Sequence, residues 1–210
     1  MKRKFKWLIP LVCLCLVLGG IGTYWIIPPK NPKIIRILSS SIIDMNNPKE
    51  VVGFADHVFV GYVEELLGTD QRQINPEVDP TETTPETLYL VNVLQNIKGN
   101  LTQKESIPIR KYGGYDPIER AVYLFEDDEL PEVGQYYVFV SIAQEDGSLL
   151  VYGVNSNVKL ETGVNQARLK ESKLVQEYED AFVNQIDERF VDRYTSKYAV
   201  SADVVPKEQQ

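Results

Sequence analysis

Few residues of this sequence have the side chains and spacing that catalysis needs. His57 is the single histidine, which excludes a metal site built on paired histidines, and its place at a helix-to-strand junction favours a structural role over that of a pH sensor. Glu64, Glu65 and Asp116 are the candidates for a hydrolytic carboxylate pair, but glycoside hydrolysis requires two carboxyl groups that face each other across a cleft. Nothing in their spacing indicates such a cleft. We therefore predict no catalytic residue, no cofactor and a protein that is not an enzyme.

Four adjacent acids at 126–129 invite comparison with a calcium-binding loop. Calcium loops place their oxygen ligands at alternate positions and a glycine at the bend. This run has neither feature, so we interpret it as a solvated loop and predict no metal site.

A short segment rich in tyrosine and glycine is the candidate ligand-binding site: Tyr112, Gly113, Gly114, Tyr115 and Asp116. Tyrosine rings around a flexible turn present flat faces to a peptide or a sugar. The alternative is a corner of a barrel, where glycines relieve steric strain. A second candidate is the polar segment 68–86, which contains three prolines. Loops of that length are usually functional or disordered.

The elements that position these residues are mainly strands. Asn47 followed by Pro48 is a helix-start pair and predicts a short helix that ends near Asp56. Runs of β-branched and aromatic residues favour strands, and Asp146-Gly147 between two apolar runs predicts a hairpin. The predicted strands are 57–68, 87–97, 106–111, 121–125, 135–143 and 149–155.

The C-terminal part changes to helical spacing. Apolar residues recur mostly every fourth position between Val175 and Tyr194, with acids between them. Each four-residue step passes a full helical turn by about 40°, so the apolar stripe drifts around the helix. We predict a long amphipathic helix over 163–198, with a bend or break near 187–189 or a second contact surface, and a flexible tail over 199–210.

The N-terminal residues predict a membrane anchor. Four basic residues precede an uncharged apolar run over 7–27, which is long enough to cross a bilayer as one helix. Trp7, Tyr24 and Trp25 suit the lipid–water boundary at its two ends. The alternative is a secretory signal that is cleaved near the glycines around position 20. Because basic residues favour the cytoplasmic side, the expected location is the cell membrane, single-pass, with the C-terminal domain extracytoplasmic.

The remaining chain is acidic and has no cysteine after Cys15. The whole chain has 30 acidic and 22 basic residues and a net charge of −8, and four of the basic residues precede the apolar run. The remaining chain is therefore more acidic still, which repels phosphate backbones and argues against nucleic-acid binding. Without disulfides, the body must be held together by its apolar core. The expected organisation is a cytoplasmic tail and transmembrane signal-anchor (1–29), a spacer (30–47), a β-barrel domain (48–162), the C-terminal helix (163–198) and the tail (199–210). The fold class is α+β.

The strand pattern resembles a known group of proteins. It is carried by apolar runs with glycines at 55–63, 87–93 and 134–140 and by the pairs Lys98-Gly99 and Gly113-Gly114. It resembles membrane-tethered or secreted, mostly uncharacterised proteins of Gram-positive bacteria, whose domain is similar to the OB-like barrel of tissue-inhibitor and netrin modules. The resemblance covers about 48–155 and implies a small antiparallel OB-like β-barrel. The animal modules use disulfides and an N-terminal cysteine that grips a protease metal, so protease inhibition by that route does not carry over.

These observations favour a membrane-anchored, extracytoplasmic binding or interaction module of the cell envelope. Its ligand would be a protein, a peptide or a glycan. One alternative is a carboxylate-dependent envelope hydrolase that uses Glu64, Glu65 and Asp116. The other is an accessory subunit of a membrane complex, whose C-terminal helix docks on a partner. A buried carboxylate pair in a deep pocket would favour the hydrolase, and scattered exposed acids would favour the module.

Overall fold

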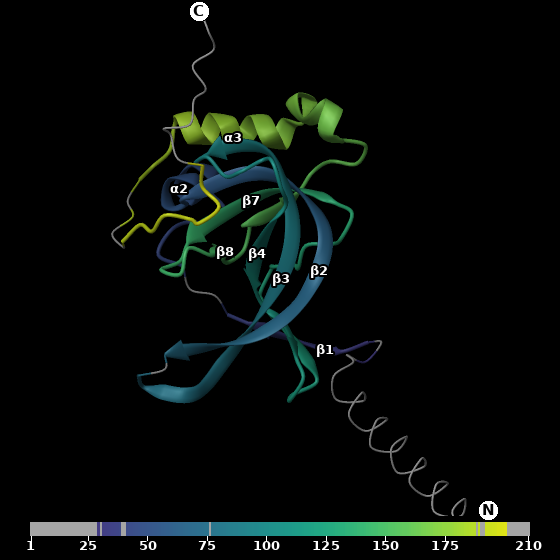
Figure 1. The fold of residues 1–210 in the computed structure, drawn as a ribbon, viewed down its shortest axis with the longest axis vertical. Coiled ribbons are helices and arrows are strands. Elements are labelled where there is room, and N and C mark those ends of the chain that lie inside the picture. Colours follow the sequence, from purple (N-terminus) through teal and green to yellow (C-terminus); the bar gives the residue numbers. More distant parts are fainter. Residues whose placement is uncertain are drawn as a thin grey trace, which may run out of the picture.

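The computed structural model describes residue 29 and residues 31–38, 41–75, 77–187, 189 and 192–200. Strands account for most of its regular structure (Figure 1). The elements in chain order are β1 (Lys33–Ile37), α2 (Pro48–Phe54), β2 (His57–Asn75), β3 (Asp79–Lys98), β4 (Ile107–Tyr112), β5 (Gly114–Asp116), β6 (Ala121–Phe125), β7 (Tyr136–Ala143), β8 (Leu149–Val151), β9 (Asn157–Lys159), the 3-10 helix η1 (Gln166–Glu171) and α3 (Lys173–Val183).

Five strands close into a barrel. Their order is β2-β3-β4-β8-β7, and β7 pairs back onto β2 from His57↔Ser141 to Tyr62↔Tyr136. The pairs are antiparallel except for β4 and β8, which run parallel with Arg110 opposite Leu150. β9 pairs with β7 along the edge that β8 also uses.

Where β2 and β7 pair, both strands are apolar on both faces because each face is buried. On the inside, the rings of Phe59 and Phe139 stack with their centroids 5.4 Å apart, within a core cluster contributed by the barrel strands. On the outside, Val58 and Val60 belong to a second cluster that includes residues of α2 and α3. Since successive side chains of a strand point to opposite faces, one short segment of β2 serves both cores.

β2 and β3 extend beyond the barrel as a two-stranded hairpin (Figure 1). Their pairing runs from Val58↔Lys98 to Asn75↔Asp79. Residues 68–86, for which the sequence predicts a functional or disordered loop, are therefore mostly strand. Register shifts interrupt the pairing, one of them next to Gly68, whose φ is +138°. Such bulges bend a strand and increase its twist.

A small second sheet packs beside the barrel. β1 lies within the stretch interpreted as a spacer and pairs parallel with β6, which pairs antiparallel with β5. Arg36 of β1 donates hydrogen bonds to the carbonyl oxygens of Phe125 (3.0 Å) and Asp128 (2.6 Å). The acidic run is thereby tied to the sheet, and Asp128 is buried rather than solvated as predicted.

The predicted fold class, α+β with a long C-terminal amphipathic helix over 163–198, is wrong. The fold is mostly β, and this region holds only η1 and the 11-residue α3, which ends at Val183. The side-chain amide of Asn184 donates to the Asp180 carbonyl oxygen (3.0 Å) at the end of α3. An apolar stripe that drifts around the helix has no single surface to pack on, which explains why the helix stops.

The residues after α3 form an irregular strap, defined as the described residues of 184–200. Its backbone donates hydrogen bonds to three separate parts of the body. Ile186 N–H donates to the Lys49 carbonyl of α2 (3.0 Å), and Lys197 N–H donates to the Gly147 carbonyl in the β7–β8 turn (3.0 Å). Near the end, Val200 N–H donates to the Asn100 carbonyl (2.8 Å). The predicted second contact surface is thus made by extended chain and not by a helix.

The predicted transmembrane signal-anchor and the single-pass location in the cell membrane are contradicted in the described part of the chain. None of its helices combines the length and the apolar character that crossing a bilayer requires. The run over 7–27, with Trp7, Tyr24 and Trp25, lies outside the described residues, as does most of the predicted flexible tail.

Candidate ligand-binding pocket

An apolar pocket of about 380 Å³ lies between α2, the segment 41–45 and the β7–β8 side of the barrel. Cavities of this size that carry a few polar groups are typical of small-molecule sites. None of the residues that line it is acidic or basic. The apolar wall includes Ile42, Ile43, Met45, Val51, Phe54, Val140, Ile142 and Leu150, and the polar groups belong to Ser41, Ser141, Gln144 and Tyr152.

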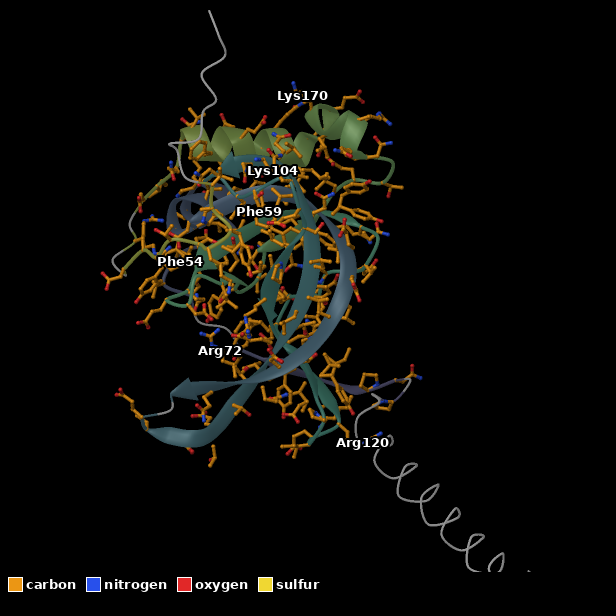
Figure 2. The ribbon with its side chains drawn as sticks, in the orientation of Figure 1. Phe54, Phe59, Arg72, Lys104, Arg120 and Lys170 are labelled. Atoms are coloured by element: carbon orange, nitrogen blue, oxygen red, sulfur yellow. The ribbon has the colours of Figure 1, made fainter. Side chains whose placement is uncertain are left out.

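The short helix α2 places Phe54 on this wall, and Figure 2 labels the residue. Asn47 caps the helix, since its side-chain oxygen accepts from Lys49 N–H (3.2 Å) and its amide donates to Glu50 Oε1 (2.9 Å). Val51 is buried against the barrel. A helix of seven residues is too short to be stable alone, so its cap and its buried face together hold Phe54 in position.

The segment 41–45 forms the opposite wall and is tied down at two points. Glu50 Oε2 accepts from Asp44 N–H (2.9 Å), and the side-chain amide of Asn155 donates to the Met45 carbonyl oxygen (3.0 Å). Ile42 keeps 63% of its surface exposed at the rim. The wall is therefore anchored near α2 but presents an apolar side chain to solvent.

The polar groups of the pocket are neutral. The buried Ser141 hydroxyl donates to the His57 carbonyl oxygen (3.4 Å). The half-buried amide of Gln144 makes no side-chain hydrogen bond to any described residue. Burial raises the pKa of the Tyr152 phenol, and the neighbouring Tyr112 adds to the rise. The pocket thus offers neutral hydrogen-bonding groups and no charge.

An aromatic cluster stands beside the pocket. The rings of Tyr112 and Phe125 stack with centroids 4.5 Å apart, and Tyr152 meets both edge-on at 5.7 and 5.5 Å. Such pairs contribute about 0.5–1.5 kcal/mol each beyond the area they bury. Tyr112, a sequence-predicted site residue, therefore supports Tyr152, which lines the pocket and which the sequence did not indicate.

The other predicted site residues have packing roles. Gly113 and Gly114 have φ of +100° and +148°, and a Cβ on Gly114 would lie 2.3 Å from Thr87 Oγ1. Thr87 also donates to the Gly113 carbonyl oxygen (2.7 Å). This close approach of backbone matches the barrel-corner alternative. Asp116 accepts hydrogen bonds from two N–H groups of the following turn, at 2.7 and 3.1 Å.

The hydroxyl of Tyr115 is buried and has no hydrogen-bond partner among the described residues. Tyr115 does not line the pocket beside α2. The five predicted residues are thus close in space because they are adjacent in sequence, and only Tyr112 reaches the neighbourhood of the pocket.

Among the described residues, three carboxylates have buried side chains and face a cation. Their side chains are 7% (Asp56), 4% (Glu86) and 3% (Asp128) exposed. The partners are Arg189 and Arg193 for Asp56 (both 2.9 Å), Arg110 for Glu86 (3.3 Å) and Lys111 for Asp128 (2.6 Å). These pairs neutralise charge in a low-dielectric interior, the usual condition for burying it.

Two of the three predicted hydrolase candidates are on the surface, and the third is half-buried. Glu64 and Glu65 are exposed on β2, and Asp116 is held in its turn. No group of three or more His, Cys, Asp and Glu side chains in the described chain is arranged to hold a metal ion.

Lys111 is a buried cation that the sequence reasoning missed. It is the third inward position of β4 after Ile107 and Ile109, and it is fully buried. Its ammonium donates to Asp128 Oδ2 (2.6 Å), the Gly153 carbonyl (2.9 Å) and Ser156 Oγ (3.1 Å). Burial lowers its pKa, and the Asp128 carboxylate opposes that shift. The alternation of β4 was the available signal, since it places a lysine on an apolar face.

A cationic cluster binds the C-terminal end of α2. Lys98 Nζ donates to the carbonyl oxygens of Val52 (2.7 Å) and Gly53 (3.1 Å), and Arg193 also donates to Gly53 (2.9 Å). Burial, followed by the charge of Arg193, lowers the pKa of Lys98 to about 8. Next to this cluster the ring of His57 is buried, and its Nδ1 has no partner among the described residues.

Comparison with known proteins does not identify the chain. No protein-family model matches it, and no curated protein matches it either.

Proposed function

We propose that this protein is a non-catalytic binding module and that the pocket beside α2 holds a neutral, largely apolar small molecule. The observation that carries the proposal is the chemistry of the lining, which combines aliphatic and aromatic walls with neutral hydrogen-bonding groups. A charged ligand would lose its hydration without gaining a counter-charge, which is costly in an apolar site. The pairing of Asp56, Glu86 and Asp128 with cations supports a binding module over a hydrolase.

A homologous series of straight-chain alcohols tests the ligand class. Each methylene that enters an apolar site contributes about 0.8 kcal/mol, which is about a fourfold decrease in Kd. We expect calorimetric titrations from butanol to decanol to show this increment until the chain fills the pocket, with a negative heat-capacity change. Alkanoates and alkylammonium ions of equal length should bind more weakly by about tenfold or more.

Two tryptophan variants locate the binding. Ile142→Trp enlarges a half-buried side chain of the pocket wall and should abolish alcohol binding. Val122→Trp is the matched control, because Val122 is equally half-buried on β6 and does not line the pocket. Equal affinity in both variants, or no saturable binding of any alcohol to the wild-type protein, would refute the proposal.

A further inference from the structure

The outer part of the β2–β3 hairpin carries strand edges that the barrel does not use. We call residues 64–75 and 79–86 the hairpin arm. The pairing of β2 with β7 ends at Tyr62, and the backbone of Val63 makes the last hydrogen bonds, to residues 134 and 135. Beyond Val63, the only strand that β2 pairs with in the described chain is β3. Isolated two-stranded ribbons are marginally stable in water, so the pairing of a further strand would stabilise an arm of this length.

The two edges of the arm are not equivalent. On the β3 side, Pro80 and Pro85 have no N–H to donate, and the Pro85 carbonyl already accepts from Gly113 N–H (2.9 Å). Prolines of this kind block the addition of a strand. On the β2 side there is no proline from Glu64 to Asn75. The edge of β2 is therefore the one that can accept another strand.

The register shows which backbone groups point outward on β2. Gln71 lies opposite Pro85, and the Pro85 carbonyl points away from β2 toward Gly113. In an antiparallel pair, directly opposite residues either exchange both hydrogen bonds or direct both pairs of groups outward. The N–H and C=O of Gln71 consequently face the open edge and take no part in the hairpin ladder.

The charge of the arm indicates the chemistry of the added strand. Residues 64–86 contain seven acidic residues and one basic residue, Arg72, which lies where the hairpin leaves the barrel (Figure 2). Glu86 is buried and pairs with Arg72 and Arg110, and Asp70 pairs with Arg110. The other five acids are exposed and have no cation within 4 Å among the described residues: Glu64, Glu65, Glu77, Asp79 and Glu82.

Leu66 and Leu67 are 52% and 47% exposed. We propose that the β2 edge of the arm binds a basic, extended segment of a partner protein by strand addition. The main-chain hydrogen bonds supply affinity, and the acidic side chains select basic residues.

A synthetic peptide provides the test. The probe is a labelled eight-residue peptide in which lysine alternates with valine, and its binding to the full-length protein is followed by fluorescence anisotropy. Saturable binding and slower hydrogen exchange at the Gln71 amide are expected. A peptide with two central prolines loses two main-chain bonds of about 1 kcal/mol each, so it should bind about thirtyfold more weakly. A peptide with glutamate in place of lysine should also lose affinity.

Substitution of Gln71 separates strand addition from charge. Gln71→Pro removes an outward N–H and leaves the hairpin ladder intact, so we expect the peptide affinity to fall about fivefold or more. Gln71→Ala is the matched control and should bind within about twofold of the wild type. Each of four results would overturn the proposal: no binding, equal binding of the proline peptide, an unprotected Gln71 amide in the complex, or sedimentation of the free protein as a dimer that Gln71→Pro dissociates.

Discussion

The buried pair of Lys111 and Asp128 allows the sharpest test of how this barrel is stabilised. Both side chains are removed from water, at 0% and 3% exposure, and their charged atoms lie 2.6 Å apart. Removing one partner of such a pair typically costs about 3–5 kcal/mol, because the other charge stays buried without compensation. We therefore expect Lys111→Met and Asp128→Leu each to lower the free energy of unfolding by about 3 kcal/mol or more.

The double variant should recover most of that loss. With both charges removed, the Gly153 carbonyl still accepts from the Ser156 hydroxyl (2.6 Å), so it keeps a hydrogen-bond partner. The N–H of Glu129, which donates to Asp128 Oδ1 (2.9 Å), belongs to an exposed residue that water can reach. Apolar replacements of buried ion pairs are often neutral or stabilising. We expect the double variant to lie within about 1 kcal/mol of the wild type.

Urea denaturation followed by circular dichroism measures all four proteins. A loss of 3 kcal/mol corresponds to a decrease of about 1–3 M in the midpoint for typical m-values, which is readily measured. The coupling free energy of the cycle, which is the difference between the summed single losses and the loss in the double variant, should be about 5 kcal/mol or more. If either single variant stays within about 0.5 kcal/mol of the wild type, or if the double variant is as unstable as the sum of the two, the pair is not a coupled unit.

Two further changes test the strap and the buried histidine. Gly53→Ala should destabilise the protein by about 1–3 kcal/mol, because the added Cβ would lie 1.9 Å from the Ile186 carbonyl oxygen and would displace the strap. Alanine usually favours a helix, so the expected loss is opposite to the intrinsic preference. Faster proteolysis within the strap would report the displacement, and unchanged stability would contradict the prediction. Burial lowers the pKa of His57 below 6.5, with the Asp56 charge opposing the shift, so as pH falls below about 6.5 the unfolded chain takes up a proton that the folded chain does not. Stability should then fall with decreasing pH between 7 and 5 by at most about 1.4 kcal/mol per unit, and chemical denaturation of His57→Asn over the same range should show no such slope.

Local sequence patterns were sufficient to predict the elements that depend on contacts between residues close together in the chain. The Asn47-Pro48 pair predicted α2, and the structure shows that Asn47 caps it. The Asp146-Gly147 turn joins β7 to β8, with φ of +74° at Gly147. The predicted strands at 87–97 and 106–111 correspond to parts of β3 and β4. In each case the deciding interaction joins residues only a few positions apart, which is why the signal is visible in the sequence.

Partners distant in the chain decided the remaining structure. The polar composition of residues 68–86 predicted a loop, but β2 and β3 pair along most of this segment, as far as Asn75↔Asp79. Helical spacing continues past Val183, but the strap beyond it is bound instead to α2, the β7–β8 turn and Asn100. Spacing within one segment carries no information about such distant hydrogen-bond partners, so the sequence predicted a loop and a long helix where the structure has neither.

The pocket also depends on contacts between residues that are distant in the sequence. The sequence alone determined that the body is β-rich, acidic and free of disulfides, because composition and strand periodicity are local properties. The alternation of β4 also places Lys111 on its inward face, but the sequence does not indicate that Asp128 is its partner. Only the tertiary structure brings Phe54, Ile142 and Tyr152 from separate elements to one cavity, since a cavity is defined by the closure of the barrel and by the placement of α2 against it.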